Sequence, residues 1–429
     1  MASTTARARA HGIADFKIPR LIKRNVTLFA LSQSFTGAGM QFAYGFGPLM
    51  VVNLTGSAAL AGLSVAILGL SRFFISYPIG KITDTYGRKP GILLGLTLGL
   101  VGALIVGWSM MLFSFPVFVG GMFVFGMGMN AAQQLRVAAT DMFPPWHRAQ
   151  ALGYIAMGSL AGLAVSPVIV RFSEPIAHST GLDPLGLPWF LLPALIVPGM
   201  CLIAFVRPDP KEIGANLERY YPGYKAEPRA PGPQPKFSGW ALLRHPRMRL
   251  AIVANCAGQG NMSIVMVLTS LVLSQHGNTL SAIALAHMFH SCGMFAFTIP
   301  LGRLSDRFGR EKIMYPGVCV SLVGACLVAL TGHWWSVTLG TFLVGLGWAA
   351  ANVAATAMIA DMAEVHVRGR AIGVGESFAG GTAMTLAIIT GPLIEWSGLP
   401  ATGLAAAAIA IPPLLMRFAA RMDRSARPA

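Results

Sequence analysis

Charged residues are scarce in this chain of 429 residues, at 11% of the sequence. Soluble proteins carry about 25% charged residues. Because 54% of the residues are apolar, too few charges remain to cover a water-facing surface. This argues against an ordinary soluble protein of this size, and the mean hydropathy of +0.62 points to lipid as the surrounding medium.

Cysteine pairs and catalytic motifs are also lacking. The five cysteines all fall in apolar runs and none has C-x-x-C spacing, so we expect neither a disulfide framework nor a zinc site. No nucleophile elbow, phosphate-binding glycine loop or metal-ligand set is present in the sequence. We therefore expect no enzyme, no catalytic residue, no metal and no cofactor.

Long apolar runs make up most of the remaining sequence. A membrane-spanning helix needs about 20 largely apolar residues, and backbone amides in lipid must find partners within their own helix. The sequence therefore predicts an all-α membrane protein with twelve transmembrane helices. These are expected at 25–49, 58–79, 91–110, 113–136, 149–171, 188–206, 249–274, 280–300, 313–331, 333–358, 369–394 and 399–418.

Basic residues are almost absent from every second loop. With the N-terminus in the cytoplasm, 30 of the 32 lysines and arginines fall on the cytoplasmic side; Arg72 lies within a span and Arg171 at the outer end of another. This asymmetry follows the positive-inside rule and predicts that both termini are cytoplasmic. A surface for nucleic acid would not alternate loop by loop, so we expect no nucleic-acid partner despite the net charge of +16.

The two halves of the chain resemble each other at an offset of about 222 residues. The run 80–89 reads GKITDTYGRK, and the run 302–311 reads GRLSDRFGRE. A duplicated six-helix unit is the organisation of many secondary transporters, with the substrate path between the halves. The expected segments are a cytoplasmic N-terminal segment (1–24), a first six-helix bundle (25–206), a proline-rich cytoplasmic linker (207–248), a second six-helix bundle (249–418) and a cytoplasmic tail (419–429).

This repeated loop resembles motif A of the major facilitator superfamily, Gly-x-x-x-Asp-(Arg/Lys)-x-Gly-Arg-(Arg/Lys). The first copy departs from the pattern at Thr85, where a basic residue is usual, and the second departs at Glu311. The resemblance covers about residues 20–420 and implies a secondary transporter with two pseudo-symmetric bundles. The matching residues are Gly80, Asp84, Gly87, Arg88 and Lys89 in the first copy, and Gly302, Asp306, Arg307, Gly309 and Arg310 in the second.

The resemblance implies that this loop acts as a gate on the cytoplasmic side. Gly80 would let the end of span two approach another helix closely. Asp84 would face the N-terminus of span eleven, whose free amides attract a carboxylate, and Arg88 would bridge to Asp141. The second copy is expected to make the equivalent contacts, with Asp306 facing the start of span five and Arg310 bridging to Asp361.

Glu376 is the only acidic residue well inside a predicted span, and its counterpart in the first half is Ala156. A carboxylate within a membrane can carry a proton through a conformational cycle. Arg72 lies at a similar depth in span two, and spans two and eleven face each other in the family. We therefore expect Glu376 and Arg72 to form a gate, made when the cytoplasmic side is shut, or a proton-coupling site, or both.

Arg136 lies near the inner end of span four, where the second half has Thr356. It is expected to bind an anionic group of the substrate, to pair with Glu376, or to extend towards the membrane surface. On span eight, His287 and His290 share one helix face. Without a third ligand they predict no metal site, and His290 is expected to line the substrate path or to pack between helices.

Amide side chains gather on the spans that are expected to line a central path. Such groups hydrogen-bond either a polar solute or a neighbouring helix. We leave both interpretations open. The candidate residues of the substrate path are Gln33, Gln41, Asn130, Gln133, Asn255, Gln259 and Asn352, together with Tyr44 on span one.

These features predict a secondary active transporter of a small organic solute, coupled to protons and working by alternating access. The run 162–167 resembles a partial form of the Gly-x-x-x-Gly-Pro motif of proton-coupled drug exporters, which favours export. Proton-coupled uptake of a small organic anion is one alternative, supported by Arg72 and Arg136. A receptor or assembly factor that kept the fold without transport is another. We expect a monomer in the lipid of the inner or plasma membrane.

Overall fold

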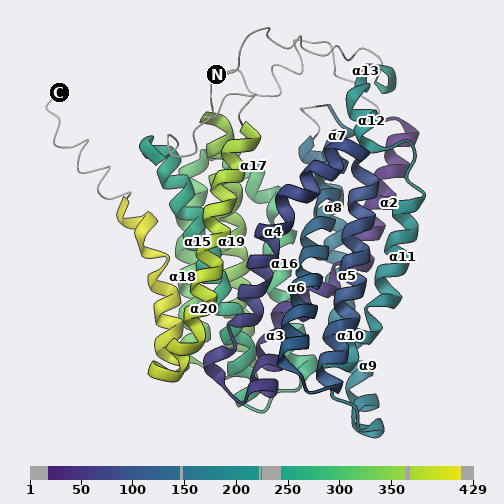
Figure 1. The fold of residues 1–429 in the computed structure, drawn as a ribbon. Helices are drawn as coiled ribbons and strands as arrows, with labels where there is room; N and C mark the ends of the chain where they lie inside the picture. The colour runs from purple at the N-terminus through teal and green to yellow at the C-terminus, as the bar shows by residue number, and fades with distance from the viewer. Residues whose placement is uncertain (1–17, 145–147, 222–223, 225–242, 363–367, 417–429) are drawn as a thin grey trace, which may run out of the picture.

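The structure is a computed structural model that describes residues 18–144, 148–221, 224, 243–362 and 368–416. Residues 1–17 of the predicted N-terminal segment, residues 222–223 and 225–242 of the predicted linker, and the tail predicted at 419–429 lie outside the described residues. The described chain is helical (Figure 1). Its helices are α2 (Arg20–Thr36), α3 (Ala38–Thr55), η1 (Ala58–Leu60), α4 (Leu63–Tyr86), α5 (Arg88–Met111), α6 (Phe115–Ala132), α7 (Gln134–Asp141), α8 (Arg148–Leu163), α9 (Val165–Thr180), α10 (Leu187–Leu191), α11 (Pro193–Ala204), α12 (Pro210–Ala215), α13 (Leu217–Tyr220), α15 (Pro246–Gln275), α16 (Leu280–Ala296), α17 (Thr298–Phe308), α18 (Arg310–Leu330), α19 (Trp334–Met362) and α20 (Arg368–Ala408).

Ten helical stretches among the described residues are long and apolar enough to cross a membrane. The run predicted at 25–49 is not one of the ten; α2 and α3 cover it and meet at Gly37. The last two predicted runs fall in one stretch, Val374–Met416, which begins in α20 and continues past its end. The backbone of α20 has non-helical angles at Gly398. The chain is therefore an all-helical, multi-pass membrane protein.

Proline explains two of the breaks within the predicted runs. The ring of Pro167 removes the backbone donor that would bond the carbonyl of Leu163, where α8 ends. Pro193 likewise begins α11 directly after α10. The periodicity of apolar residues does not report such breaks, because residues on both sides of each break are apolar.

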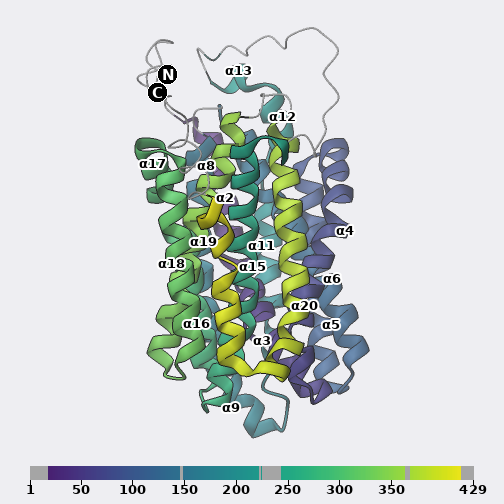
Figure 2. The same ribbon diagram turned by 90° about the vertical axis from the view of Figure 1, so that its left-hand side faces the viewer.

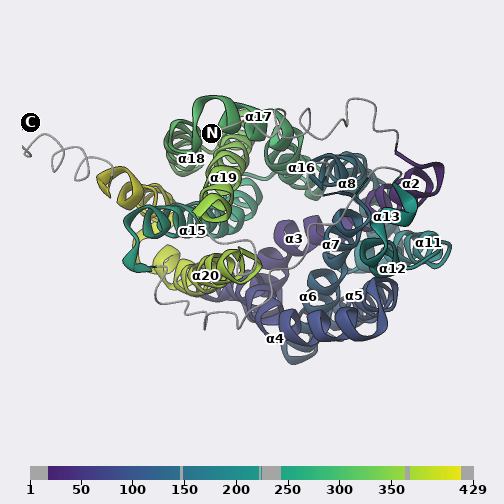
Figure 3. The ribbon, with the colours of Figure 1, turned by 90° about the horizontal axis from the view of Figure 1, so that it is seen from above.

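The helices form two groups that lie side by side, as Figure 3 shows in a view along them. The first group comprises α2 to α11, and the second comprises α15 to α20; each packs mainly within itself. The helix α15 lies where the groups meet, because it packs against α3 as well as α18, α19 and α20. Its side chains are almost all buried from Leu250 to Leu273.

The molecule has two distinct ends (Figures 1 and 2). We call the end with α12 and α13 the linker end, and the opposite end, where α9 meets α10, the far end. The hydroxyl of Tyr221, which follows α13, donates to the carbonyl of Met142 at 2.9 Å. Burial raises the pKa of Tyr221, so the phenol keeps its proton at neutral pH. The segment after α11 is thereby attached to the first group.

The sequence repeat is visible as a repeat in helix packing. A Cβ atom at Gly102 of α5 would overlap the backbone of Phe125 in α6, and one at Gly324 of α18 would overlap the backbone of Gly340 in α19. These two glycines are 222 residues apart. In both groups, therefore, the absence of a side chain lets two helix backbones come into contact.

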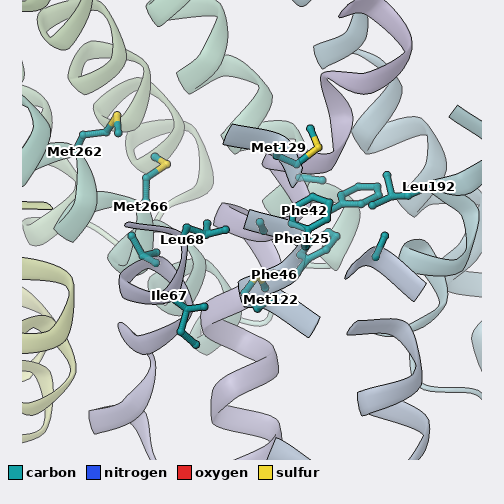
Figure 4. Packing of buried hydrophobic residues seen from close by; sticks show 14 of the residues in the cluster. Phe42, Phe46, Ile67, Leu68, Met122, Phe125, Met129, Leu192, Met262 and Met266 are labelled. Carbon is teal, nitrogen blue, oxygen red and sulfur yellow. The ribbon is translucent and has the colours of Figure 1, made fainter. Parts of the chain in front are cut away.

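Aromatic side chains fill the core of the first group. The rings of Phe42 and Phe46 stack with centroids 5.6 Å apart, and Phe125 meets Trp189 edge to face at 5.1 Å. Figure 4 shows Phe42, Phe46 and Phe125 gathered between α3 and α6. This dense packing makes the first group a rigid unit on which polar residues can be positioned.

Candidate functional site

The motif loops turn at glycines with left-handed backbone angles. Gly87 lies between α4 and α5 with φ of 109°, and Gly309 lies between α17 and α18 with φ of 99°. Residues with a Cβ atom are strained at such angles. Both copies of the motif therefore fold into the same tight reversal at the linker end.

Each motif arginine links two helices of its own group. The guanidinium of Arg88 donates to Asp141 at 2.8 Å and to the hydroxyl of Thr83 at 3.1 Å. The guanidinium of Arg310 donates to Asp361 at 2.9 Å. The second copy completes the same pattern with the hydroxyl of Ser305, at 3.3 Å from Arg310. Both expected ion pairs are present, whereas the hydroxyl partners Thr83 and Ser305 were not predicted.

Asp209 adds a contact that the sequence did not suggest. Its carboxylate accepts hydrogen bonds from the backbone amides of Arg88 and Lys89 at 3.0 Å each. It also accepts from the amide of Lys211 at 2.9 Å and so caps α12. One carboxylate thus satisfies free amides at the start of two helices, α5 and α12. It joins the motif loop of the first group to the chain that follows α11.

The close approach expected at Gly80 is absent in this conformation. A Cβ atom at Gly80 would have no neighbour within 4 Å, and one at Gly302 would meet only Val353 at 3.9 Å. The linker-end part of α4 is therefore not packed against another helix at Gly80. The side chains of Asp84 and Asp306 lie outside the described part of the structure, so their expected partners stay predictions.

Glu376 and Arg72 meet between the two groups. A guanidinium nitrogen of Arg72 on α4 lies 3.4 Å from a carboxylate oxygen of Glu376 on α20. The other carboxylate oxygen accepts a hydrogen bond from the amide of Asn255 on α15 at 3.2 Å. The side chain of Asn352 on α19 donates in turn to Asn255 at 2.9 Å. Four candidate residues from four helices thus form one chain of polar contacts.

A second polar contact lies one helical turn away. Trp348 is four residues before Asn352 on α19, and Gln259 is four residues after Asn255 on α15. The indole N–H of Trp348 donates to the side-chain oxygen of Gln259 at 2.8 Å. Because α15 and α19 are antiparallel neighbours, the two pairs form successive rungs between them. The amides on α15 therefore face the same side of the second group as Glu376.

Arg136 and Tyr44 lie near this network from the side of the first group. Both interact electrostatically with Arg72. The guanidinium of Arg136 lies 5.7 Å from the ring centre of Phe295 on α16, a cation–π contact between the groups. Among the described residues, no carboxylate lies within 4 Å of Arg136. Glu376 pairs with Arg72 instead, so the region has two arginines for one described acid.

The remaining amide candidates make separate contacts. Gln41 donates to the hydroxyl of Ser291 on α16, across the groups. Asn130 donates to Gly126 one turn earlier on its own helix, at 2.8 Å. Gln133 lies at the junction of α6 and α7, and its side-chain oxygen is buried without a partner among the described residues. Gln33 is half-buried on α2.

The segment formed by η1 and α4 packs against α20, and its closest contacts lie towards the far end. Glycines make the closest contacts, because a Cβ atom at Gly62 or Gly391 would overlap a carbonyl of the other group. The antiparallel register pairs Ala59 with Gly391, Gly62 with Ala387, Gly69 with Met384, and Arg72 with Glu376. Continued towards the linker end, this register would reach Gly80, where the structure shows open space.

Two further contacts between the groups lie at the far end. The hydroxyl of Ser270 on α15 donates to the carbonyl of Gly45 on α3 at 2.7 Å. The carboxylate of Glu174 on α9 accepts from the backbone amide of Leu280 at 3.3 Å and from the hydroxyl of Ser281 at 2.7 Å, at the start of α16. The far end is therefore closed by contacts on three sides. On one flank, α8 and α17 also touch nearer the linker end, at Gly153 and Ile299.

Two repeated groups of membrane helices with a polar site between them are typical of a class of membrane transporter. The chain belongs to the Major Facilitator Superfamily, which it matches over residues 29–272 and 250–428. The resemblance of the motif loops to this family is thereby confirmed.

Relatives of this chain are transporters or carry transport-related names. It is 26% identical to the riboflavin transporter RfnT of Brucella anthropi, over 88% of this chain and 90% of that protein. It is 26% identical to the multidrug resistance protein MdtG of Enterobacter lignolyticus, over 87% of this chain and 85% of that protein. The fold is similar to the inward-facing, unoccupied crystal structure of a bacterial homologue of the human lysosomal transporter Spinster. That comparison has a TM-score of 0.67 at 14% identity and covers 94% of this chain and 97% of the other.

Proposed function

We propose that this protein is a secondary active transporter that exports a small organic solute in exchange for protons by alternating access. The position of Glu376 carries the proposal, since its carboxylate contacts Arg72 of the first group and Asn255 of the second. Protonation removes the negative charge and weakens the ion pair to Arg72. Proton binding at this carboxylate is thereby coupled to the relative movement of the two groups.

The contacts between α4 and α20 support a cycle of two states. In the state described above, these helices touch from the far end to the pair of Arg72 and Glu376. In the other state, Gly80 would approach α20 and the far-end contacts would separate. The side chains of Arg72 and Glu376 are 48% and 32% exposed, so neither is sealed within the helix packing in the present state.

Names of relatives support the solute class and the direction. A riboflavin transporter is consistent with a polar organic solute, and a multidrug resistance protein is consistent with export. The two rungs between α15 and α19 offer amide groups and an indole beside Glu376. These groups suit a solute with hydrogen-bonding atoms on an apolar frame.

Purified protein in vesicles with an imposed pH gradient tests this proposal. The solute is first sought in a growth and toxicity screen of cells with and without the protein. Glu376→Gln is expected to abolish proton-driven exchange while solute counterflow without a gradient persists. Glu395→Gln, an exposed acid on the same helix, is the matched control and is expected to leave both unchanged. Proton-driven exchange by Glu376→Gln at the rate of the parent protein would refute the role of this carboxylate.

Exchanging the two charges separates a gate from a proton site. The double variant Arg72→Glu with Glu376→Arg keeps the ion pair and reverses its polarity. If the pair acts only as a gate, the double variant is expected to transport while each single variant fails. If Glu376 also carries the proton, the double variant stays inactive in proton-driven exchange.

The same proposal includes a membrane topology. We propose twelve transmembrane helices in two six-helix bundles (25–206 and 249–418), with both termini and the linker end on the cytoplasmic side. We also propose that the protein is a monomer in the inner or plasma membrane. The basic motif loops and α12 at the linker end support this orientation. Cysteine labelling tests it. In a cysteine-free background, Lys211→Cys is expected to react only from inside and Asn53→Cys only from outside. The reverse pattern would overturn the orientation.

Uptake of a small organic anion is a second candidate, because Arg136 lies between the groups without a carboxylate partner among the described residues. An anionic solute would neutralise this arginine, and a hydrogen bond to a charged group contributes about 1.5–3 kcal/mol. Arg136→Gln is therefore expected to weaken binding of the anion at least tenfold, and Arg136→Lys less. Equal affinity of the parent for an anion and its neutral amide would reject this candidate.

A further inference from the structure

Two histidines of α16 are buried with incomplete hydrogen bonding. The side chains of His287 and His290 are only 1% and 2% exposed. The Nε2 atom of His287 lies 2.9 Å from the hydroxyl of Ser270, and the Nδ1 atom of His290 lies 2.7 Å from the carbonyl of Thr341. The other ring nitrogen of each histidine is buried and has no hydrogen-bond partner among the described residues.

The partners assign the protons on these rings. The hydroxyl of Ser270 donates its single proton to the carbonyl of Gly45, so it accepts a hydrogen bond from Nε2–H of His287. The carbonyl of Thr341 can only accept, so Nδ1 of His290 carries a proton. Each unpartnered nitrogen is then a bare lone pair. Both rings are neutral, and a second proton on either ring would give a buried N–H without an acceptor.

His287 differs from His290 in its place between the groups. A Cβ atom at Gly45 would lie 3.1 Å from the ring of His287, so this ring packs directly on the backbone of α3. Ser270 connects the same ring to Gly45. By contrast, His290 bonds to α19 of its own group. Separation of the groups at the far end must therefore break the Ser270–Gly45 bond and uncover His287, while the bond of His290 can persist.

Few charges surround His287 in the described structure. The helices α3, α15 and α19 carry no charged side chain at its level, since their described charges lie towards the linker end. From α9, Glu174 bonds the start of α16 at Leu280, seven residues from His287 and about 10 Å along the helix. The other titratable side chains of α9, Arg171 and His178, are exposed. On its own helix, His290 is the titratable group that acts on it electrostatically. No described carboxylate is placed to stabilise an imidazolium at His287 in the closed far end.

We propose that His287 is a proton-binding site of the far-end gate, neutral while that end is closed and protonated when it opens. This inference rests on the proposed alternation between two states and adds a second proton site to Glu376. The open state binds the proton because water then surrounds the ring and can accept from its second N–H. A ligand that binds one state better shifts the population towards that state. Acid on the far side therefore favours the conformation that opens to that side.

The expected response follows from proton linkage. Histidine in water has a pKa of about 6.5. When only the open state takes up the proton, the ratio of open to closed molecules rises by up to about tenfold for each pH unit below this value. A change from pH 7.5 to pH 5.5 is therefore expected to increase that ratio by roughly tenfold.

Distances between spin labels at the far end test the proposal. Leu60 of the first group and Trp396 of the second are both exposed there. With the five native cysteines removed, Leu60→Cys and Trp396→Cys carry the labels in full-length protein in lipid nanodiscs. The background also carries Glu376→Gln, which removes the response of that carboxylate to pH. Acidification is expected to raise the fraction of long distances.

Two variants identify the group that responds. His287→Gln can still bond Ser270 but cannot take up a proton, so it is expected to lose the response to pH. His290→Gln is the matched control and is expected to keep it. An unchanged response in His287→Gln, or none in the labelled parent protein, would overturn the proposal. A far end that never opens at any pH or in any variant would instead contradict the proposed alternation of access.

A variant that keeps the histidine itself separates loss of the proton site from loss of fold. Ser270→Ala removes the bond to Gly45 and keeps His287. It is expected to shift the labelled protein towards the open far end at every pH while retaining a response to acid. A monodisperse elution profile of each variant in detergent shows that the comparison is made on folded protein.

Discussion

Removing the carboxylate of Glu174 should weaken the closed far end by a predictable amount. In the closed state this group accepts two hydrogen bonds at the start of α16, from Leu280 and Ser281. A hydrogen bond to a charged group contributes about 1.5–3 kcal/mol, and a negative charge near a helix N-terminus about 0.3–1 kcal/mol. Because Glu174 is only half-buried, water replaces part of these contacts, and we expect a net loss of about 1–2 kcal/mol.

A loss of this size is measurable as a change in population. It corresponds to a 5- to 30-fold increase in the ratio of open to closed molecules. The spin-label pair at Leu60 and Trp396 reports that ratio directly for Glu174→Ala. A smaller shift is expected for Glu174→Gln, whose amide oxygen can still accept one bond.

The control for this prediction is Glu395→Gln, which removes an exposed carboxylate on α20. It should leave the distances unchanged. A change of less than twofold in the open-to-closed ratio for Glu174→Ala would refute the contribution expected from the contacts to α16. The reasoning would also fail if Glu395→Gln produced the same shift, because the effect would then reflect net charge.

Two further substitutions test the fold. Gly102→Ala places a methyl group against the backbone of Phe125 and should destabilise the protein by about 1–3 kcal/mol, seen as a lower thermal unfolding temperature in detergent. The control Gly120→Ala places its methyl group in open space and should leave the unfolding temperature unchanged. Equal behaviour of the two variants would refute the packing argument. Asp209→Asn should lower stability by about 1–2 kcal/mol through loss of a charged cap on α5 and α12, whereas an unchanged unfolding temperature would show that water caps these helices equally well.

The sequence predicted the helical architecture because the backbone of a segment in lipid must satisfy its own hydrogen bonds. Apolar runs of the right length must be helices, and ten helical stretches among the described residues are long and apolar enough to cross a membrane. It did not predict where helices break, such as the junction at Gly37, because glycine is common within transmembrane helices and does not by itself mark their ends. Burial of α15 on all sides could not be predicted from the sequence either, because it depends on which helices are its neighbours.

The central ion pair was predictable for a particular reason. An acid within a membrane span is costly and rare, so Glu376 and Arg72 were conspicuous as possible partners. Their connection to Asn255 and Asn352 was not, because many amides lie in spans and only the helix arrangement decides which ones meet. Asp209 was missed because it stands in a polar, proline-rich stretch, where a capping carboxylate looks like any solvated acid.

Thr83 and Ser305 show another limit of sequence reasoning. Hydroxyl groups within helices usually bond their own backbone, as Thr83 also does with Gly80. Their second role, as acceptors for the motif arginines, follows from the tight reversal at Gly87 and Gly309, which brings each arginine back towards the preceding helix. Comparison of the two halves offers a signal, since both positions carry a hydroxyl at an offset of 222.

The glycine contacts between α4 and α20 imply that the two ends of the molecule differ in their response to ionic strength. At the far end, Gly62 and Gly391 bring backbone carbonyls against the other helix, and such short-range attraction is not screened by dissolved ions. Opposite charges on partly exposed side chains, as at Arg72 and Glu376, are screened wherever dissolved ions reach them, with a screening length of about 8 Å at physiological salt. Rising salt concentration should therefore weaken the ion pair of Arg72 and Glu376 well before it affects the contacts at Gly62 and Gly391.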